Sequence, residues 1–312
     1  MAGKRGDRST EASVRLADVV ATRHAALRDN LEAARQGTVH GVHQARVATR
    51  RLRETVPIAA VNLSGTRRRR LRRVLRTLTR ALGDVRECDV SLAMIDALAT
   101  TPSGGSRQWQ RRWIRDLTRR RRRARTHLLE VSNPADVAWL DERLSGLAEL
   151  RRTSPDLGWQ RRLGELLDTR GRTRRASIDA AGVMWSADPL HEVRIATKRL
   201  RYALELTGEC GLAAVARPLS TLKKVQDVLG RLHDIDVVLA HVRSPDDDGA
   251  PDADADLDET CRTLEHERHR LHATYLRRRA ALIAVADLVR DDLGPPLTDV
   301  RASASADLAH AD

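Results

Sequence analysis

The 312-residue chain contains no phenylalanine, and its five tryptophans and two tyrosines bring the aromatic content to only 2%. A hydrophobic core must therefore be aliphatic, and a hydrophobic content of 41% is sufficient for one. Because β-favouring aromatics are few and Ala, Leu, Arg and Glu are abundant, the composition favours helix over strand. The same scarcity argues against a site that stacks nucleic-acid bases on aromatic rings.

Cysteines and long apolar runs are also scarce. Cys88, Cys210 and Cys261 form no CxxC pair, which is typical of reduced thiols in a cytoplasmic protein. No apolar run approaches the ~18 residues of a transmembrane helix. The first residues, MAGKRGDRSTEASVR, contain no apolar segment of the kind found in secretory signals. We therefore expect a cytoplasmic protein without a membrane partner.

Positive charge is abundant. The chain has 56 basic and 43 acidic residues, a formal net charge of +13, and only four lysines: Lys4, Lys198, Lys223 and Lys224. Arginine presents a planar fork that binds phosphate or carboxylate through two hydrogen bonds. A GC-rich genome would explain the ratio of Arg to Lys. It would not explain why the cations recur in regular stripes.

Two segments occur twice along the chain. VHQARVATRRLR at 42–53 matches LHEVRIATKRLR at 190–201 in seven of twelve positions. LGDVRECDV at 82–90 matches LGRLHDIDV at 229–237. The first match is offset by 148 residues and the second by 147, so the two lie in nearly one register. This agreement predicts an internal duplication.

The first repeated segment predicts a helix with one cationic face, since at about 100° per residue four cationic positions fall within an arc of about 80°. In the first half these are His43, Arg46, Arg50 and Arg53. In the second half they are His191, Arg194, Lys198 and Arg201. Like charges at this spacing repel one another, so the stripe favours an anionic partner.

Other interpretations of this face stay open. Carboxylates of the protein could neutralise it, and the nearest in sequence are Asp84, Glu87, Asp89, Asp234 and Asp236. The histidines could also be ordinary core residues or metal ligands, but no HExxH motif or His/Cys cluster has ligand spacing. We expect no metal and no cofactor, and histidines that donate hydrogen bonds to phosphate oxygens. Binding should then tighten at lower pH as His43 and His191 protonate.

Further cations lie on neighbouring helices. The candidates are Arg69, Arg73, Arg76, Arg217, Lys223 and Lys224. The five arginines at 119–123 circle their helix, so no single groove can use all of them. Asp89 and Asp236 are expected to cap the next helix or to hold a neighbouring arginine, with Gly83 and Gly230 permitting a tight bend.

Helical periodicity along most of the chain predicts an all-α fold. The expected helices lie at about 12–36, 39–60, 67–82, 89–99, 107–131, 135–150, 157–170 (or 157–181), 189–206, 212–229, 234–242 and 254–292. They predict two similar four-helix-type bundles. The bundles would occupy 12–150 and 151–293, between a flexible N-terminus at 1–11 and a flexible tail at 294–312.

The motif H-x-x-R-[VI]-x-x-[KR]-R-x-R, present twice and followed each time by LGxxxxxDV, resembles the CHAD (conserved histidine α-helical domain) family over about residues 12–290. The resemblance implies two similar bundles around a pseudo-twofold axis with a basic surface between them. It also implies binding of inorganic polyphosphate and association with polyphosphate granules. Many members carry a triphosphate-tunnel domain, whose ExExK motif is absent here, so we expect a stand-alone member. The second half departs from the first at Arg231 and His233 and in an acidic segment at 244–258.

We therefore expect a protein that binds inorganic polyphosphate without catalysis, because that polymer offers a line of charges and no bases. A basic helical nucleic-acid binder is the alternative, and weak nucleic-acid binding is expected in either case. An enzyme acting on phosphoanhydrides is a third candidate. It would need a phosphate loop or an acidic metal cluster, and the sequence has neither GxxxxGK[ST] nor carboxylates in register with the basic stripe.

Overall fold

A computed structural model of the chain describes residues 2–99, 108–154, 158–242 and 255–293. Within these ranges there is no strand, which confirms the all-α prediction. The helices of the first half are α1 (Ala2–Arg35), α2 (Val39–Ala59), α3 (Gly65–Ala99), α4 (Gln108–Val131) and α5 (Pro134–Thr153). Those of the second half are α6 (Gly158–Ala181), α7 (Ala187–Glu209), α8 (Ala216–Val242), α9 (Ala255–Leu288) and a π-helical turn at Val289–Leu293.

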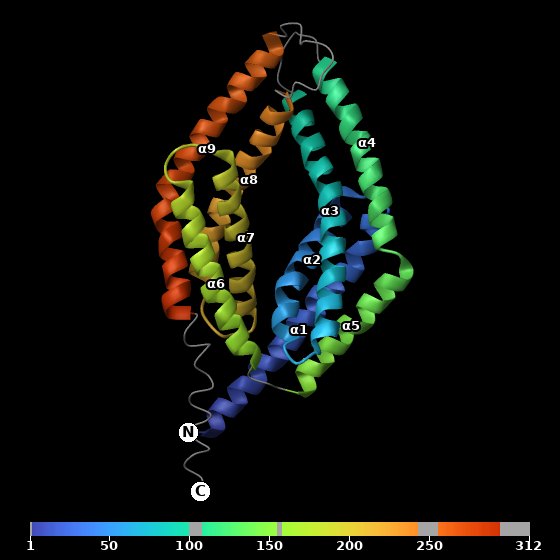
Figure 1. Cartoon of the computed structure of the whole chain (residues 1–312), viewed down its shortest axis with the longest axis vertical. Coiled ribbons are helices and arrows are strands. Elements are labelled where there is room, and N and C mark those ends of the chain that lie inside the picture. The colour runs from blue at the N-terminus through green and yellow to red at the C-terminus, as the bar shows by residue number, and fades with distance from the viewer. Residues whose placement is uncertain (1, 100–107, 155–157, 243–254, 294–312) are drawn as a thin grey trace.

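The helices form two groups that stand side by side (Figure 1). Helices α1–α5 make one group and α6–α9 the other, and α3 with α4 and α8 with α9 form two long pairs that reach toward the same end of the molecule. Contacts between the groups run from α2 to α6 and α7, from α1 to α7, and from α3 to α8. The middle of the molecule is therefore bordered by α2, α3, α7 and α8.

Local sequence signals explain where several helices begin and end. The Thr38 hydroxyl accepts a hydrogen bond from the Gly41 amide at 3.1 Å, which caps the start of α2. Asn133 caps α5 in the same way, with Pro134 in the first turn. Gly37, at the end of α1, has a φ of 85°, a conformation that glycine adopts without strain.

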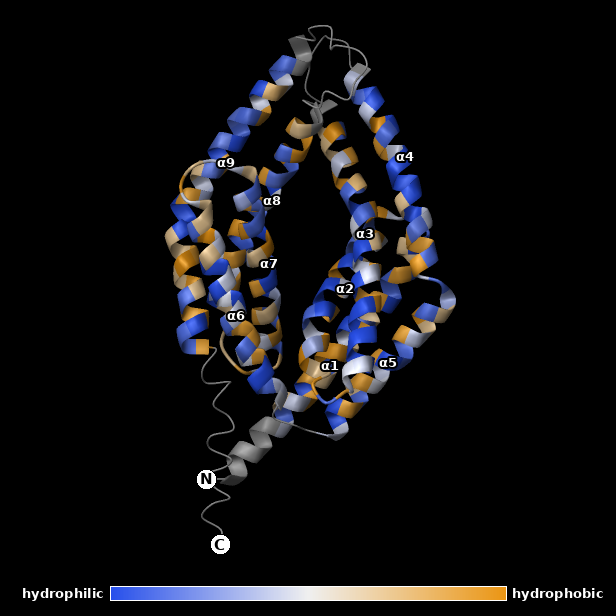
Figure 2. Cartoon of the chain, in the orientation of Figure 1, coloured by the Kyte–Doolittle hydropathy of each residue, from blue (hydrophilic) through white to orange (hydrophobic). Residues whose placement is uncertain are grey.

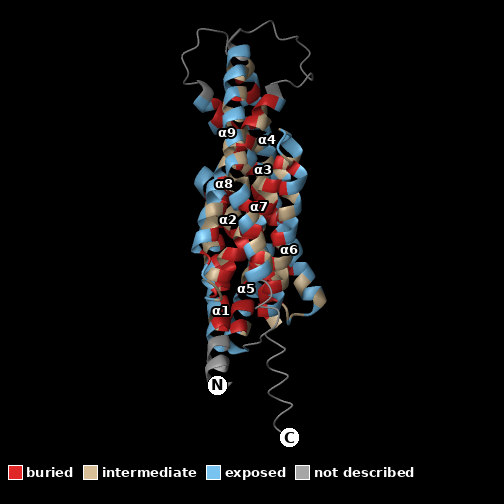
Figure 3. Ribbon diagram, turned by 90° about the vertical axis from the view of Figure 1, so that its left-hand side faces the viewer, coloured by how far each residue is buried: buried red, intermediate tan, exposed pale blue. Residues whose placement is uncertain are grey.

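The core is aliphatic, as predicted. The main cluster of buried side chains consists mostly of Leu, Val, Ala and Ile and runs along the faces that the helices turn toward one another (Figures 2 and 3). A second, smaller cluster joins the two long helix pairs α3–α4 and α8–α9. In it, Ile95 and Trp113 of the first half pack with Ile235 and Leu264 of the second. This second cluster holds α3 and α8 close together.

Two predicted breaks are wrong. Both α3 and α8 continue through Gly83 and Gly230, neither of which has the positive φ of a tight bend. Apolar packing explains the continuity of α3. Leu78 and Leu82 before the glycine and Val85 after it are all buried. Their packing outweighs the cost of about 1 kcal/mol that glycine imposes inside a helix.

The boundaries differ in smaller ways. Helix α1 begins at Ala2 rather than at residue 12, so the segment 1–11, expected to be flexible, is largely helical. Residues 244–254 of the acidic segment, and the tail at 294–312 that is expected to be flexible, lie outside the described residues. No helix in the described ranges combines the length and the apolar character needed to cross a membrane. Cys88 and Cys210 are free thiols.

Candidate anion-binding site

A cavity of about 380 Å³ lies between the two halves, bordered by α2 and α3 on one side and α7 and α8 on the other. Among the described residues that line it, seven are permanent or potential cations: Arg46, Arg50, Arg53, Arg86, Arg194, Lys198 and Arg199. The lining also includes two histidines, His191 and His233, and three carboxylates, Glu54, Glu87 and Asp234. With every lysine and arginine charged, the cavity carries an excess of four positive charges.

Positions that match in the sequence repeat meet across this cavity. Helix α2 contributes Arg46 and Arg50, and α7 contributes their counterparts Arg194 and Lys198. Helices α3 and α8 supply further matched pairs: Arg86 with His233, Glu87 with Asp234, and Val90 with Val237. A duplication around a pseudo-twofold axis would produce such pairing. The duplication itself stays a prediction.

Arg46 lies deepest among the cations of α2. Burial lowers the pKa of its guanidinium to about 10, and the charges of Arg50, Arg194 and Arg86 contribute. Gly83 of α3 lies beside it, since a β-carbon at that position would be 3.5 Å from Nε of Arg46. The Nε atoms of Arg46 and Arg194 are buried and donate to no acceptor within the described part of the chain. These donors suit an anion that enters from outside the protein.

The opposite wall contains a lysine and two histidines whose charged forms are disfavoured. Burial lowers the pKa of Lys198 to about 6, helped by the charges of Arg194, Arg50 and Arg46. Nδ1 of His191 lies 3.2 Å from Nδ1 of His233, and burial, Arg194 and His191 lower the pKa of His233 to about 4. Burial and Arg194 also lower the pKa of His191. An anion in the cavity would relieve this repulsion and favour the protonated forms.

The carboxylates of the protein neutralise little of this charge. Glu54 accepts a hydrogen bond from Arg170 of α6 at 3.2 Å, which engages it with a cation outside the cavity lining. Glu87 is exposed. Asp234 faces the cations, and burial raises its pKa although Arg194 and Arg231 act in the opposite direction.

Asp89 and Asp236, which occupy matching positions in the segments 82–90 and 229–237, lie near arginines outside the cavity lining. Nε of Arg121 in α4 donates to Asp89 at 2.6 Å, and Nη1 of Arg268 in α9 lies 4.0 Å from Asp236. The expectation that these aspartates hold a neighbouring arginine is confirmed. The alternative, that they cap the next helix, is wrong because both lie inside continuous helices.

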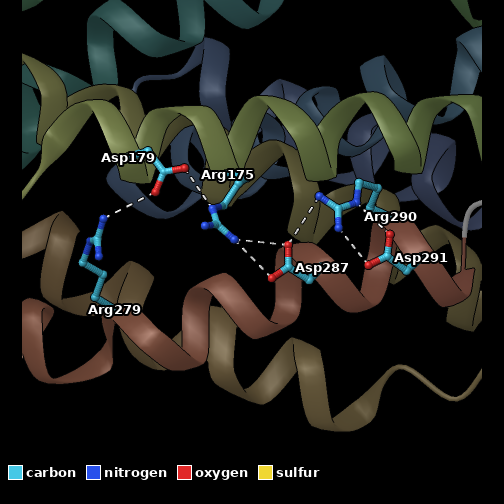
Figure 4. Close-up of polar contacts among 6 residues, drawn as sticks. All are labelled: Arg175, Asp179, Arg279, Asp287, Arg290 and Asp291. Atoms are coloured by element: carbon cyan, nitrogen blue, oxygen red, sulfur yellow. Dashed lines mark hydrogen bonds and ion pairs between the residues drawn. The ribbon is translucent and has the colours of Figure 1, made fainter.

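The arginines on the outer face of the second half contrast with those of the cavity. Arg175 of α6 donates to Asp179 at 2.9 Å and to Asp287 of α9 at 3.2 Å (Figure 4). Arg279 reaches Asp179 at 3.4 Å, and Arg290 binds Asp291 at 2.7 Å. Here each guanidinium has a carboxylate partner. The charges of these three arginines are therefore balanced by carboxylates, in contrast to the excess of positive charge in the cavity.

Six of the predicted site residues line the cavity: Arg46, Arg50, Arg53, His191, Arg194 and Lys198. His43 is exposed beside it, and slight burial together with the charges of Arg86 and Arg46 lowers its pKa. Arg201 is drawn instead to Glu205, 3.3 Å away, and its guanidinium lies over the ring of Tyr202. Each repeated stripe therefore contributes three of its four residues to the described lining, but the missing residue is the histidine in the first stripe and the last arginine in the second.

The predicted cations of α3 and α8 lie outside the cavity. Arg69, Arg73 and Arg76 are exposed on α3, as are Arg217, Lys223 and Lys224 on α8. The pKa of Arg53 is lowered mainly by burial, and then by the charges of Arg50 and Arg199. The charge of Arg76 makes a smaller contribution, so Arg76 lies near Arg53. Arg76 thus extends the cationic surface outward from the cavity. The contribution of the other five to binding stays a prediction.

Sequence reasoning missed three residues of the lining: Arg86, Arg199 and His233. His233 entered the sequence analysis only as a difference between the two copies, and Arg86 is its counterpart in the first copy. Their matched positions three residues before Asp89 and Asp236 were the available signal. Arg199 belongs to the KR pair of the histidine motif, but its place on the helical wheel lies outside the predicted stripe. Within the described residues, no group of three His, Cys, Asp or Glu side chains could hold a metal ion.

Comparisons with known proteins agree with this architecture. The solved structure of PptA from Streptomyces chartreusis has a TM-score of 0.61 and 18% identity, and the match covers 85% of this chain and 98% of that one. The CHAD domain from the plant Ricinus communis has a TM-score of 0.55 and 22% identity, covering 89% and 91%. At such identities the likeness concerns the fold alone. No curated protein matched the sequence. The model of the CHAD domain family matches residues 18–243, which is more than half of the chain, and the chain therefore belongs to the CHAD family.

Proposed function

We propose that this protein binds inorganic polyphosphate without altering it, and that the cavity between the two halves holds a segment of the polymer. The CHAD family, which is associated with polyphosphate binding, supplies one line of support. The cavity supplies the other, since its lining is cationic and has few aromatic groups. In a cell we expect the protein in the cytoplasm, at polyphosphate granules.

The observation that carries the proposal is the convergence of like charges from both halves. Arg46 and Arg50 of α2 meet Arg194 and Lys198 of α7. Burial and the charges of neighbouring cations lower the pKa values of Arg46, Arg194 and Lys198, which shows the cost of bringing these groups together. A bound anion with several closely spaced charges would offset the repulsion among these cations. A polyphosphate segment meets this requirement, and its ends would continue over the exposed cations of α3 and α8.

Salt dependence tests the electrostatic part of the proposal. If the seven cations of the cavity each contact the polymer, the log–log slope of affinity against salt should be near −5, using about 0.7 per contact as for single-stranded nucleic acids. The assay is a titration of long-chain polyphosphate at several salt concentrations. An affinity that does not change with salt would contradict this mechanism.

A matched pair of variants tests the location. Replacing both Arg46 and Arg194 by alanine should lower affinity at least about tenfold and flatten the salt slope by roughly 1.4. The control is Arg172→Ala, which removes an exposed arginine whose partner is Asp168 at 3.0 Å on the same helix. Circular dichroism verifies that both variants fold. Equal losses in the two would place binding elsewhere on the basic surface.

The same assay separates the rival functions. Long-chain polyphosphate should displace bound DNA at a far lower phosphate concentration than DNA needs to displace polyphosphate, because the cavity offers charge but little stacking surface. Incubation with polyphosphate, Mg²⁺ and nucleotide should leave the polymer length unchanged. Turnover in that incubation would indicate an enzyme instead.

A further inference from the structure

Among the described residues that line the cavity, Lys198 is the only lysine. Its counterpart across the cavity is Arg50. Two of the other lysines, Lys223 and Lys224, are exposed on α8. The difference from arginine matters chemically, because an amine that loses its proton becomes a nucleophile, whereas a guanidinium stays charged and inert.

The groups around Lys198 come from three helices. Arg194 and His191 lie on its own helix α7, Arg46 and Arg50 face it from α2, and His233 and Asp234 face it from α8. Asp234 is the sole carboxylate in this set, and the charges of Arg86 and Arg231 act on it as well. Burial among these cations lowers the pKa of Lys198 to about 6, so at neutral pH its amine is mostly unprotonated.

We propose that Lys198 is a site of covalent acylation by small acyl phosphates, with the neighbouring arginines holding the phosphate group while the amine attacks the acyl carbon. The geometry combines two requirements in one cavity: a nucleophile, and several donors suited to a phosphate dianion. The inference shares with the proposed function the premise that these arginines bind phosphate.

The reaction is balanced without a further reactant. The lone pair of the Lys198 nitrogen forms a bond to the carbonyl carbon of acetyl phosphate, and the bond from that carbon to the bridging oxygen breaks. Phosphate leaves with the electron pair of that bond and takes the proton released by the nitrogen, giving HPO₄²⁻. The products are an acetylated lysine and inorganic phosphate.

Acylation would also weaken polyphosphate binding. An amide cannot take up the proton that a bound polyanion would favour on the amine, so the cavity loses one of its seven potential cations. A metabolite carrying an activated acyl group could in this way reduce the occupancy of the cavity.

The test uses the other lysines as internal standards. The whole protein is treated with acetyl phosphate at pH 7, and peptide mass spectrometry follows the acetylation rates of Lys198, Lys223 and Lys224. A pKa near 6 raises the unprotonated fraction roughly 3,000-fold over an ordinary lysine. If amines lose nucleophilicity with pKa as thiols do, the net advantage is about tenfold. Equal rates at the three lysines would overturn the proposal.

Concentration dependence separates docking from mere reactivity. The rate at Lys198 should saturate as acetyl phosphate increases, because the reagent binds before it reacts, whereas the rates at Lys223 and Lys224 should stay linear. With acetic anhydride, which lacks a phosphate group, the rate at Lys198 should stay linear as well. A linear response of Lys198 to acetyl phosphate would refute the docking step.

The Lys198→Arg variant links acylation to binding. Whatever the affinity of this variant for polyphosphate, treatment with acetyl phosphate should leave that affinity unchanged, whereas the same treatment should weaken binding by the wild type. A protein that binds polyphosphate but shows no preference for Lys198 would refute the acylation site alone. If acetyl phosphate modifies Lys198 preferentially but the untreated protein does not bind polyphosphate, the proposed function alone is refuted.

Discussion

Polyphosphate binding should be coupled to proton uptake, and Lys198 should carry most of that coupling between pH 8 and pH 6. In the free protein, burial and neighbouring arginines hold the pKa of Lys198 at about 6, so the amine is largely neutral at pH 8. A bound polyanion favours the charged form and raises the pKa. Since the complex binds more protons than the free protein, affinity must rise as pH falls.

The size of the effect follows from the two pKa values. If the polyanion returns Lys198 to the ordinary lysine value of about 10.4, affinity should increase roughly 50-fold between pH 8 and pH 6. Below the free-state pKa of Lys198 the curve flattens for this residue. His191 and His233, whose pKa values are also lowered, then add to the coupling at more acidic pH.

Isothermal titration calorimetry in buffers of different ionisation enthalpy measures the proton uptake directly. We expect close to one proton per cavity at pH 7.5 in the wild type. Lys198→Arg should bind with little pH dependence in this range, because arginine is charged throughout. A double alanine variant of His43 and His191 should keep most of the wild-type dependence. Zero proton uptake, or the same pH profile in Lys198→Arg as in the wild type, would refute this reasoning.

Three further substitutions have defined outcomes. Asp234→Asn should tighten polyphosphate binding at least about tenfold at pH 7, because it removes a negative charge from the lining of the cavity, and unchanged affinity in a titration would contradict this. Gly83→Ala should raise the free energy of unfolding by up to about 1 kcal/mol in urea denaturation, because alanine favours the helix and its methyl group fits beside Arg46. A lower free energy of unfolding in this variant would show that glycine is required there. Ser13→Ala should cost about 1–3 kcal/mol in the same assay, since it leaves the buried indole of Trp159 without the acceptor that now lies 3.0 Å away, and an unchanged midpoint would argue that this hydrogen bond contributes nothing.

The fold class was accessible from composition and periodicity because a helix shows its buried face in every turn. The helical spacing of Leu71, Val74, Leu75, Leu78 and Leu82 predicts one apolar stripe. The four leucines are buried and Val74 is partly buried. Helix ends were harder to predict. A glycine inside a helical pattern looks the same in sequence whether the chain bends there or continues, and at Gly83 the packing on both sides decided for continuation.

The candidate site divides in the same way. Sequence by itself determined that His43, Arg46 and Arg50, and their repeats in the second half, lie on cationic helix faces, because the spacing within one helix is local information. Only the tertiary structure decided that Arg46 and Arg194 confront each other across one cavity while Arg201 turns to Glu205. Those outcomes depend on how α2 and α7 pack, and packing between residues 148 positions apart leaves no periodic trace in a single sequence.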